Sequence, residues 1–267
     1  MKPLFLLVND DGIHSPGLKA AAEAVADLGE LLIVAPHVQQ TGMGRAFPRT
    51  PETGIIDEVE LEICGKPVLA YAVHGSPAYA AAHGVLELAE RKPDLCISGI
   101  NYGENLGTIP TCSGTLGAAF EANTHEVPAI AVSLQADLKI QHSNDFGHQD
   151  WSVAQRHLRY WTKQVMEKGM PGQADTLNIN VPAHPDDPEK FYLARQSRQN
   201  YFCFQPPGPR DRSKRFELKS KLWVDEDTLE PDSDVFAAYK KNITAVAPLT
   251  IDMTAGGQSF GEYSIQE

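Results

Sequence analysis

The chain opens on short apolar runs separated by segments with helical spacing. Residues 4–8 are all apolar, as in a strand buried on both faces of a parallel sheet, and residues 31–35 repeat this pattern. Between them, Ser15 and Pro16 form a typical helix start, and apolar residues then recur at helical spacing. Further strands are expected at residues 68–73, 94–98, 129–134 and 177–181. Further helices are expected after Ser76, near Ser113 and over 151–168.

This alternation predicts an α/β protein with a Rossmann-like, open, mostly parallel sheet and flanking helices. Residues 1–181 are expected to form this catalytic core, with 55–73 as a short excursion of extended segments. Residues 182–231 are rich in proline and charge, which predicts a projecting β-arm that mediates oligomerisation. Residues 232–267 are expected to add a helix and a strand that return to the core or to a neighbouring subunit.

The charge balance narrows the possible partners. The chain has 267 residues and a formal net charge of −12, from 23 Lys and Arg against 35 Asp and Glu. Such a surface repels polyanions, which argues against a nucleic-acid polymer or an anionic membrane as a partner. A small anion can still bind where a local metal ion overrides the overall field.

We expect a cytoplasmic protein with free thiols. No apolar run approaches the ~20 residues of a membrane helix. The first apolar run ends at Val8 and carboxylates follow it, unlike in a signal peptide. The cysteines lack a metal-ligand spacing, which favours a reducing compartment. They are Cys64, Cys96, Cys112 and Cys203.

The first candidate chemistry lies where the first strand ends, in Asn9-Asp10-Asp11-Gly12. Neighbouring side chains of a strand point to opposite faces, so Asp10 and Asp11 converge only if the chain is already turning there. Gly12 gives the backbone freedom for such a turn. Two carboxylates held together repel unless a cation lies between them, which predicts a hard divalent metal ion. The alternative is Asp-Gly turn chemistry combined with a helix cap.

Other polar residues follow other predicted strands. Thr41 follows residues 31–35, Ser76 follows 68–73, and Asn101 and Asn105 lie in a glycine-rich, irregular segment after 94–98. Open parallel sheets bind ligands outside the carboxyl ends of their strands, so these side chains are expected to converge. Carboxylate, hydroxyl and amide oxygens suit Mg²⁺, Mn²⁺ or Ca²⁺ better than Zn²⁺.

The segment Ser113-Gly114-Thr115 offers backbone N–H groups and hydroxyls at a predicted helix N-terminus. Such a terminus is a ready site for a phosphate group. A hydroxyl-rich helix start is also a common cap without any ligand. Beside a metal site, the phosphate interpretation is favoured.

At these positions the sequence closely resembles the SurE family of stationary-phase survival proteins, which act as metal-dependent 5′-nucleotidases. The matching segments are residues 9–17, 98–107 and 113–115. The resemblance implies hydrolysis of nucleoside 5′-monophosphates to nucleoside and phosphate. It also implies a homodimer or homotetramer that exchanges its C-terminal arm.

The resemblance further implies a role for individual residues. It implies one divalent cation, Mg²⁺ or Mn²⁺, bound by Asp10, Asp11, Thr41 and Asn101. It implies phosphate contacts from Asn105, Ser113, Gly114 and Thr115.

Two segments depart from the family pattern. His37 stands where the family usually has an aspartate, and the basic residue that normally follows in that loop is replaced as well. Tyr79 also takes the place of an aspartate. These changes spare the predicted metal ligands and affect the expected substrate pocket.

Several alternatives remain at this point. A metal-bound water is the expected nucleophile, and His14 is the candidate general acid or base. A nucleotide-binding module without turnover is the non-enzymatic alternative. A zinc N-deacetylase centred on His184 is disfavoured, because Pro188 replaces the glutamate of that motif. Cys112 as a nucleophile lacks an activating partner in the sequence.

The predicted arm carries a basic island within an acidic protein. Over 208–222, Asp211 and Glu217 are the acidic residues. The basic residues are Arg210, Arg212, Lys214, Arg215, Lys219 and Lys221. Aromatic residues flank them, and a thin projection cannot bury such side chains by itself. The composition therefore predicts that the arm packs on a neighbouring subunit.

Overall fold

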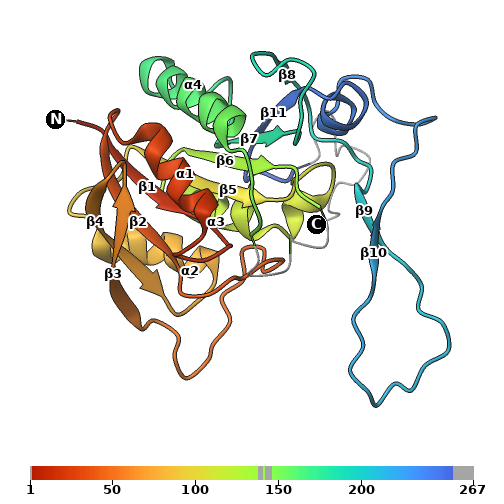
Figure 1. Ribbon diagram of the computed structural model, residues 1–267, viewed down its shortest axis with the longest axis horizontal. Coiled ribbons are helices and arrows are strands. Elements are labelled where there is room, and N and C mark those ends of the chain that lie inside the picture. Colours follow the sequence, from red (N-terminus) through yellow and green to blue (C-terminus); the bar gives the residue numbers. More distant parts are fainter. Residues whose placement is uncertain (1, 138–140, 142–145, 255–267) are drawn as a thin grey trace, which may run out of the picture.

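The computed structural model describes residues 2–137, 141 and 146–254. Its centre is β1 (Leu4–Val8), which is buried along its whole length. The flanking strands β2 (Glu30–Pro36) and β5 (Leu95–Tyr102) both run parallel to β1. The chain leaves β1 toward β2 and later returns on the other side as β5, so the order of the strands reverses at β1 (Figure 1). A crevice at such a reversal is the usual ligand site of an open α/β sheet.

The sheet has nine strands in the order β3-β4-β2-β1-β5-β6-β7-β11-β8. Strands β4 (Lys66–Val73), β6 (Ala129–Leu134) and β7 (Thr176–Val181) extend its parallel part. Antiparallel pairs lie toward its margins, where β3 (Ile56–Ile63) joins β4 and β11 (Thr244–Leu249) joins β7. The predicted α/β class with a mostly parallel sheet is therefore confirmed. The excursion expected at 55–73 is instead built into the sheet as β3 and β4.

Helices cover both faces of the sheet (Figure 1). Helices α1 (Pro16–Val25) and α4 (Ser152–Lys168) pack on one face, and α2 (Pro77–His83) and α3 (Gly114–Thr124) pack on the other. A π-helical turn, Gly84–Leu88, continues α2.

The two hydrophobic clusters follow the alternation of side chains along β1. Phe5 and Leu7 belong to the cluster under α1 and α4, whereas Leu6 and Val8 belong to the cluster under α2 and α3. Because β1 contributes side chains to both clusters, every one of its side chains must be apolar. This requirement explains the uninterrupted apolar run that the sequence shows.

The strand expected to end at Ser98 continues to Tyr102. Its pairing with β6 is irregular between Ser98 and Asn101, where Gly99 has a φ of +124°. A Cβ atom at Gly99 would lie 2.3 Å from the carbonyl oxygen of Val132, so only glycine fits there. The structure thus places Asn101 on the end of a strand rather than in a loop.

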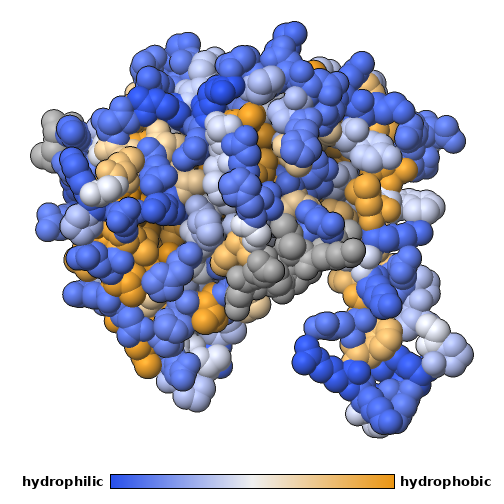
Figure 2. Space-filling view, viewed as in Figure 1, coloured by the Kyte–Doolittle hydropathy of each residue, from blue (hydrophilic) through white to orange (hydrophobic). Residues whose placement is uncertain are grey.

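The C-terminal part divides into a packed portion and a projection. Strand β8 (Phe191–Leu193) pairs with β11 at the edge of the main sheet. Strands β9 (Phe202–Phe204) and β10 (Ser220–Leu222) form an antiparallel hairpin that projects from the body (Figure 1). Figure 2 shows hydrophobic residues among hydrophilic ones on this projection. Residues 255–267 of the expected C-terminal segment lie outside the described residues.

Two short helical turns complete the described chain, a 3₁₀ turn at Ile109–Thr111 and a π-helical turn at Phe236–Lys240. In the described part of the chain, no helix combines the length and apolar character needed to cross a membrane. The four cysteines are unpaired.

Candidate metal and phosphate site

The turn after β1 is closed by the side chain of Asn9. Its Oδ1 accepts a hydrogen bond from the Gly12 N–H (3.2 Å), and its Nδ2 donates to the Gly12 carbonyl oxygen (3.0 Å). Gly12 has a φ of +95°, which other residues rarely adopt. The carbonyl oxygen of Asp10 accepts from the Gln40 N–H (2.7 Å), so the loop after β2 is fixed against this turn.

Asp10 is buried against the start of α3. Its side chain is 2% exposed, and its Oδ1 accepts a hydrogen bond from the Thr115 hydroxyl at 2.7 Å. A Cβ atom at Gly114 would lie 2.8 Å from the other carboxylate oxygen, so only glycine allows this approach. Burial raises the pKa of Asp10 to about 6, because removal from water penalises the charged carboxylate.

Asp11, which follows Asp10 in the turn after β1, is 4% exposed. Its carboxylate lies against the end of β5. Its Oδ2 accepts from the Tyr102 N–H and its Oδ1 from the Gln39 side-chain amide, both at 3.3 Å. The pKa of Asp11 is raised well above its usual range, mainly by burial and also by the negative charge of neighbouring Asp10. A divalent cation would remove both penalties, since it neutralises the paired carboxylates.

Thr41 and Asn101 offer further oxygen atoms. The Thr41 hydroxyl is buried and has no hydrogen-bond partner among the described residues. Asn101 donates its Nδ2 to the Gly103 carbonyl oxygen (2.7 Å), which leaves its amide oxygen as the atom suited to a cation. A buried hydroxyl that makes no hydrogen bond within the protein is available as an oxygen ligand for a cation. With Asp10 and Asp11, this donor set fits a hard divalent ion.

The loop after β2 is held over the start of α3, which brings Thr41 to this side of the sheet. The Gly44 N–H donates to the Cys112 carbonyl oxygen (3.0 Å), and Arg45 forms an ion pair with Glu121 (2.7 Å). The Ser76 hydroxyl donates to the Ala46 carbonyl oxygen at 2.6 Å. Ser76 therefore supports the loop, a role that its place after a strand does not reveal.

The predicted phosphate-binding residues gather at the N-terminus of α3. Ser113 caps the helix, because its hydroxyl accepts from the Leu116 N–H at 3.2 Å. Asn105 donates its Nδ2 to the Ser133 hydroxyl (2.9 Å) and to the Thr115 hydroxyl (3.5 Å). Thr115 thus connects Asp10 on one side to Asn105 on the other.

Two asparagines of β7 hold Asn105 in place, and the sequence interpretation missed both. Asn180 Oδ1 accepts from the Asn105 N–H (2.7 Å), and Asn178 donates its Nδ2 to the Asn105 carbonyl oxygen (2.9 Å). Both side chains are almost completely buried. Polar residues at alternate positions of an otherwise apolar strand were the signal that could have identified them.

A further buried carboxylate, that of Glu104, lies next to Asn105. Glu104 accepts hydrogen bonds at its Oε1 from the Tyr201 hydroxyl (2.7 Å) and the Gln135 side-chain amide (3.2 Å). Its Oε2 is buried and lacks a partner among the described residues. Burial raises the pKa of Glu104. Tyr201 precedes β9 directly, so this contact joins the base of the arm to the loop of the site.

His14 is exposed on the turn between β1 and α1, and its role as general acid or base stays a prediction. His184 is also exposed, and neighbouring Asp187 forms an ion pair with Lys190 (3.1 Å). Within the described ranges, one group of three or more His, Cys, Asp or Glu side chains is close enough to share an ion, and it does not include His184. Burial raises the pKa of the Cys112 thiol, which disfavours a nucleophilic thiolate.

The chain is similar over most of its length to proteins of one family. A family profile described as "Survival protein SurE" matches residues 5–202. The 5′-nucleotidase SurE of Methanocella arvoryzae is 39% identical over 266 residues, covering 95% of this chain and 94% of the relative. That of Thermococcus kodakarensis is 37% identical over 254 residues, covering 94% and 93%. The crystal structure of the SurE protein from Aquifex aeolicus has a TM-score of 0.74 and 28% identity, covering 94% of this chain and 95% of that one.

Proposed function

The chain belongs to the SurE family, and from this premise we infer that it is a 5′-nucleotidase, which hydrolyses nucleoside 5′-monophosphates to nucleoside and phosphate. The family expected from the sequence is thereby confirmed. The observation that carries the proposal is the buried pair Asp10 and Asp11 at the reversal of strand order, directly against the N-terminus of α3.

We propose that Asp10, Asp11, Thr41 and Asn101 hold one divalent cation, Mg²⁺ or Mn²⁺. The raised carboxylate pKa values and the Thr41 hydroxyl without a partner support this donor set. When bound, such a cation polarises a phosphoryl group and increases the acidity of a bound water. Neither magnesium nor manganese is favoured over the other by the oxygen donors alone.

The residues of the chain itself would bind and orient the phosphate. The first N–H groups of α3, at Gly114 and Thr115, lie at the positive end of the helix. Asn105 adds a side-chain amide, which donates to the Ser133 and Thr115 hydroxyls, while β7 fixes the Asn105 backbone. Because all these groups are oriented before the substrate arrives, they stabilise developing negative charge without rearranging.

The proposed assembly is a homodimer or homotetramer held through the arm. Exposed aromatic side chains on the hairpin support this, with Arg210 over the ring of Phe216 (4.8 Å) and Lys221 over the ring of Trp223 (4.6 Å). The acidic surface of the body is a suitable counterpart for the basic residues. The proposed compartment is the cytoplasm, in keeping with the unpaired cysteines.

Phosphate release from a panel of nucleoside 5′-monophosphates tests the function. We expect release in Mg²⁺ or Mn²⁺ buffer, no release after EDTA treatment, and recovery when the metal is returned. The matching 3′-monophosphates serve as a control for position. Binding of the 5′-nucleotides without any phosphate release would instead identify a binding module that lacks turnover.

A further inference from the structure

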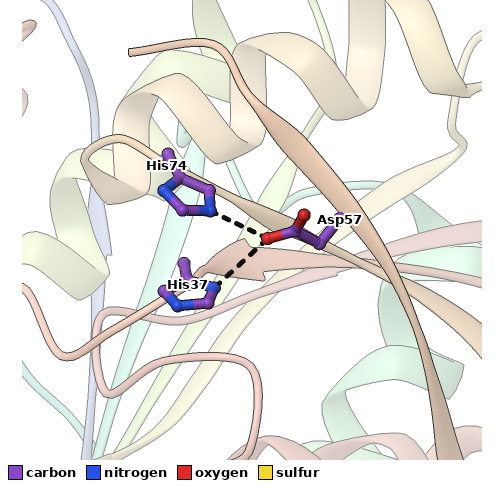
Figure 3. Close-up of side chains that lie close together, drawn as sticks. All are labelled: His37, Asp57 and His74. Carbon is purple, nitrogen blue, oxygen red and sulfur yellow. Dashed lines mark hydrogen bonds and ion pairs between the residues drawn. The ribbon is translucent and has the colours of Figure 1, made fainter. Parts of the chain in front are cut away.

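Three side chains that the proposed function does not use converge at one side of the sheet (Figure 3). His37 follows β2, His74 follows β4, and Asp57 lies on the antiparallel strand β3. Figure 3 shows both imidazole rings pointing toward the Asp57 carboxylate. Among the described residues, this is the group of three or more His, Cys, Asp or Glu side chains close enough to share a metal ion.

The backbone around these side chains is fixed by regular hydrogen bonds. The His37 N–H donates to the Val73 carbonyl oxygen and the His74 N–H to the Ile55 carbonyl oxygen, both at 2.8 Å. Asp57 pairs with Ala72 in the ladder between β3 and β4. The three side chains are therefore held by sheet structure rather than by a mobile loop, as a preorganised site requires.

The distances between potential ligand atoms fit a metal site. Asp57 Oδ2 lies 2.8 Å from His74 Nε2 and 3.5 Å from His37 Nδ1, and all three atoms lie within 4.8 Å of one another. A tetrahedral zinc site with bonds of about 2.1 Å separates its ligand atoms by about 3.4 Å. Small movements of the exposed His37 and Asp57 side chains would reach this spacing.

The second nitrogen of His74 lies near a carboxylate, as is common for metal-binding histidines. His74 Nδ1 lies 3.6 Å from the Glu52 carboxylate. A carboxylate behind a ligating imidazole fixes its tautomer and increases its basicity. The side chains of His37 and Asp57 are 48% and 49% exposed, which leaves room for water or a further ligand on the open side.

We propose that His37, Asp57 and His74 bind a second divalent ion of the zinc type, separate from the ion of the oxygen-rich site. Two imidazoles and one carboxylate are donors that Zn²⁺ prefers, whereas the oxygen donors around Asp10 suit Mg²⁺ or Mn²⁺. The site adjoins the loop that contacts Asp10 and Asp11 through Gln40 and Gln39. An ion at His37 would thus anchor the start of that loop.

Calorimetric titration of the full chain with Zn²⁺ alone tests this proposal. The background is the Asp10→Asn, Asp11→Asn double variant, in which the oxygen-rich site is disabled, so the result does not depend on catalysis. We expect one Zn²⁺ to bind and His37→Ala to weaken binding at least about tenfold. His74→Ala should act in the same way, Glu52→Gln more weakly, and the distant His184→Ala not at all.

A second readout identifies the ligands directly. Cobalt(II) bound to the double variant should give visible absorption bands typical of low coordination number, and His37→Ala should remove them. Circular dichroism of each variant checks that it is folded. Because the His37 side chain is exposed, we expect His37→Ala to fold normally. The proposal is overturned if the double variant binds no Zn²⁺, or if folded His37→Ala binds Zn²⁺ as tightly as its parent.

Discussion

At the scale of single residues, the site consists of buried carboxylates with different surroundings. Asp11 lies next to the charge of Asp10, whereas Glu104 accepts hydrogen bonds from two side chains at one of its oxygens. In each case burial disfavours the charged form. The cation that we propose would compensate this cost for the aspartates, and no such role is assigned to Glu104.

Glu104 should make stability depend on pH. Its pKa is raised above the ordinary value of 4.5, so the folded state binds a proton more readily than the unfolded state. Stability from this group is present at low pH and is lost as pH rises above about 4.5 and through the folded-state pKa. Glu104→Gln keeps an acceptor for Tyr201 but cannot titrate.

We therefore expect the melting temperature of Glu104→Gln, relative to the wild type, to be higher at pH 8 than at pH 4. Thermal unfolding at a series of pH values measures this difference. Tyr201→Phe is the matched control, since it removes the hydroxyl donor and should cost about 1 kcal/mol without adding a titrating group. Parallel curves for Glu104→Gln and the wild type would contradict the prediction.

Asp10→Asn should hold or raise the melting temperature in EDTA. The substitution removes one of two buried charges that repel each other when no metal is bound. The same variant should lose the increase in melting temperature that Mg²⁺ or Mn²⁺ gives the wild type, because a ligand that binds only the folded state stabilises it. Differential scanning calorimetry with and without metal measures both effects. A metal-induced shift equal to that of the wild type would place the ion elsewhere.

At the scale of elements, the apolar run of β1 and the Ser-Pro helix start made the central unit predictable. The end of β5 could not be predicted, because its glycine and polar residues are not typical of a strand. There the constraint is the approach of Gly99 to Val132 on β6, which depends on which strands are neighbours. The His37, Asp57 and His74 group was missed for the same reason, since it joins a residue of β3 to the residues that follow β2 and β4.

Gly99→Ala should destabilise the protein strongly. The new Cβ atom would collide with the Val132 carbonyl oxygen, and the φ of +124° is unfavourable for alanine. We expect a loss of about 2 kcal/mol or more in the free energy of unfolding. Gly208→Ala is the matched control, because open space surrounds that position and its backbone conformation imposes no strain. Equal denaturation midpoints for the two variants in urea would disprove this explanation.

At the scale of the whole molecule, the sheet positions the site, and we propose that the arm mediates assembly. The hairpin of β9 and β10 pairs with itself, whereas β8, also within 182–231, pairs with β11 of the main sheet. Composition indicated the projection but did not separate the part that packs on the body. That separation depends on contacts such as Tyr201 with Glu104, which link residues far apart in the sequence.

Replacing residues 206–222 with a short Gly-Ser linker should weaken assembly and leave the body folded. The deletion removes β10 and the exposed Phe216, so the hairpin can no longer pack on the neighbouring surface that we propose. Sedimentation velocity should show smaller particles for the deletion variant than for the wild type at the same micromolar concentration. Arg212→Ala, a single change in the same segment, is the milder control. A wild type that sediments as a clean monomer would refute the proposed assembly.

Phosphate release as a function of free Mg²⁺ or Mn²⁺ tests the central claim most directly, with Asp11→Asn beside the wild type. The account predicts metal-dependent release from a nucleoside 5′-monophosphate by the wild type and a decrease of at least ~100-fold in kcat/KM for Asp11→Asn, because one charged metal ligand is lost. His184→Ala should match the wild type. Full activity of Asp11→Asn after EDTA treatment and return of the metal would contradict the account.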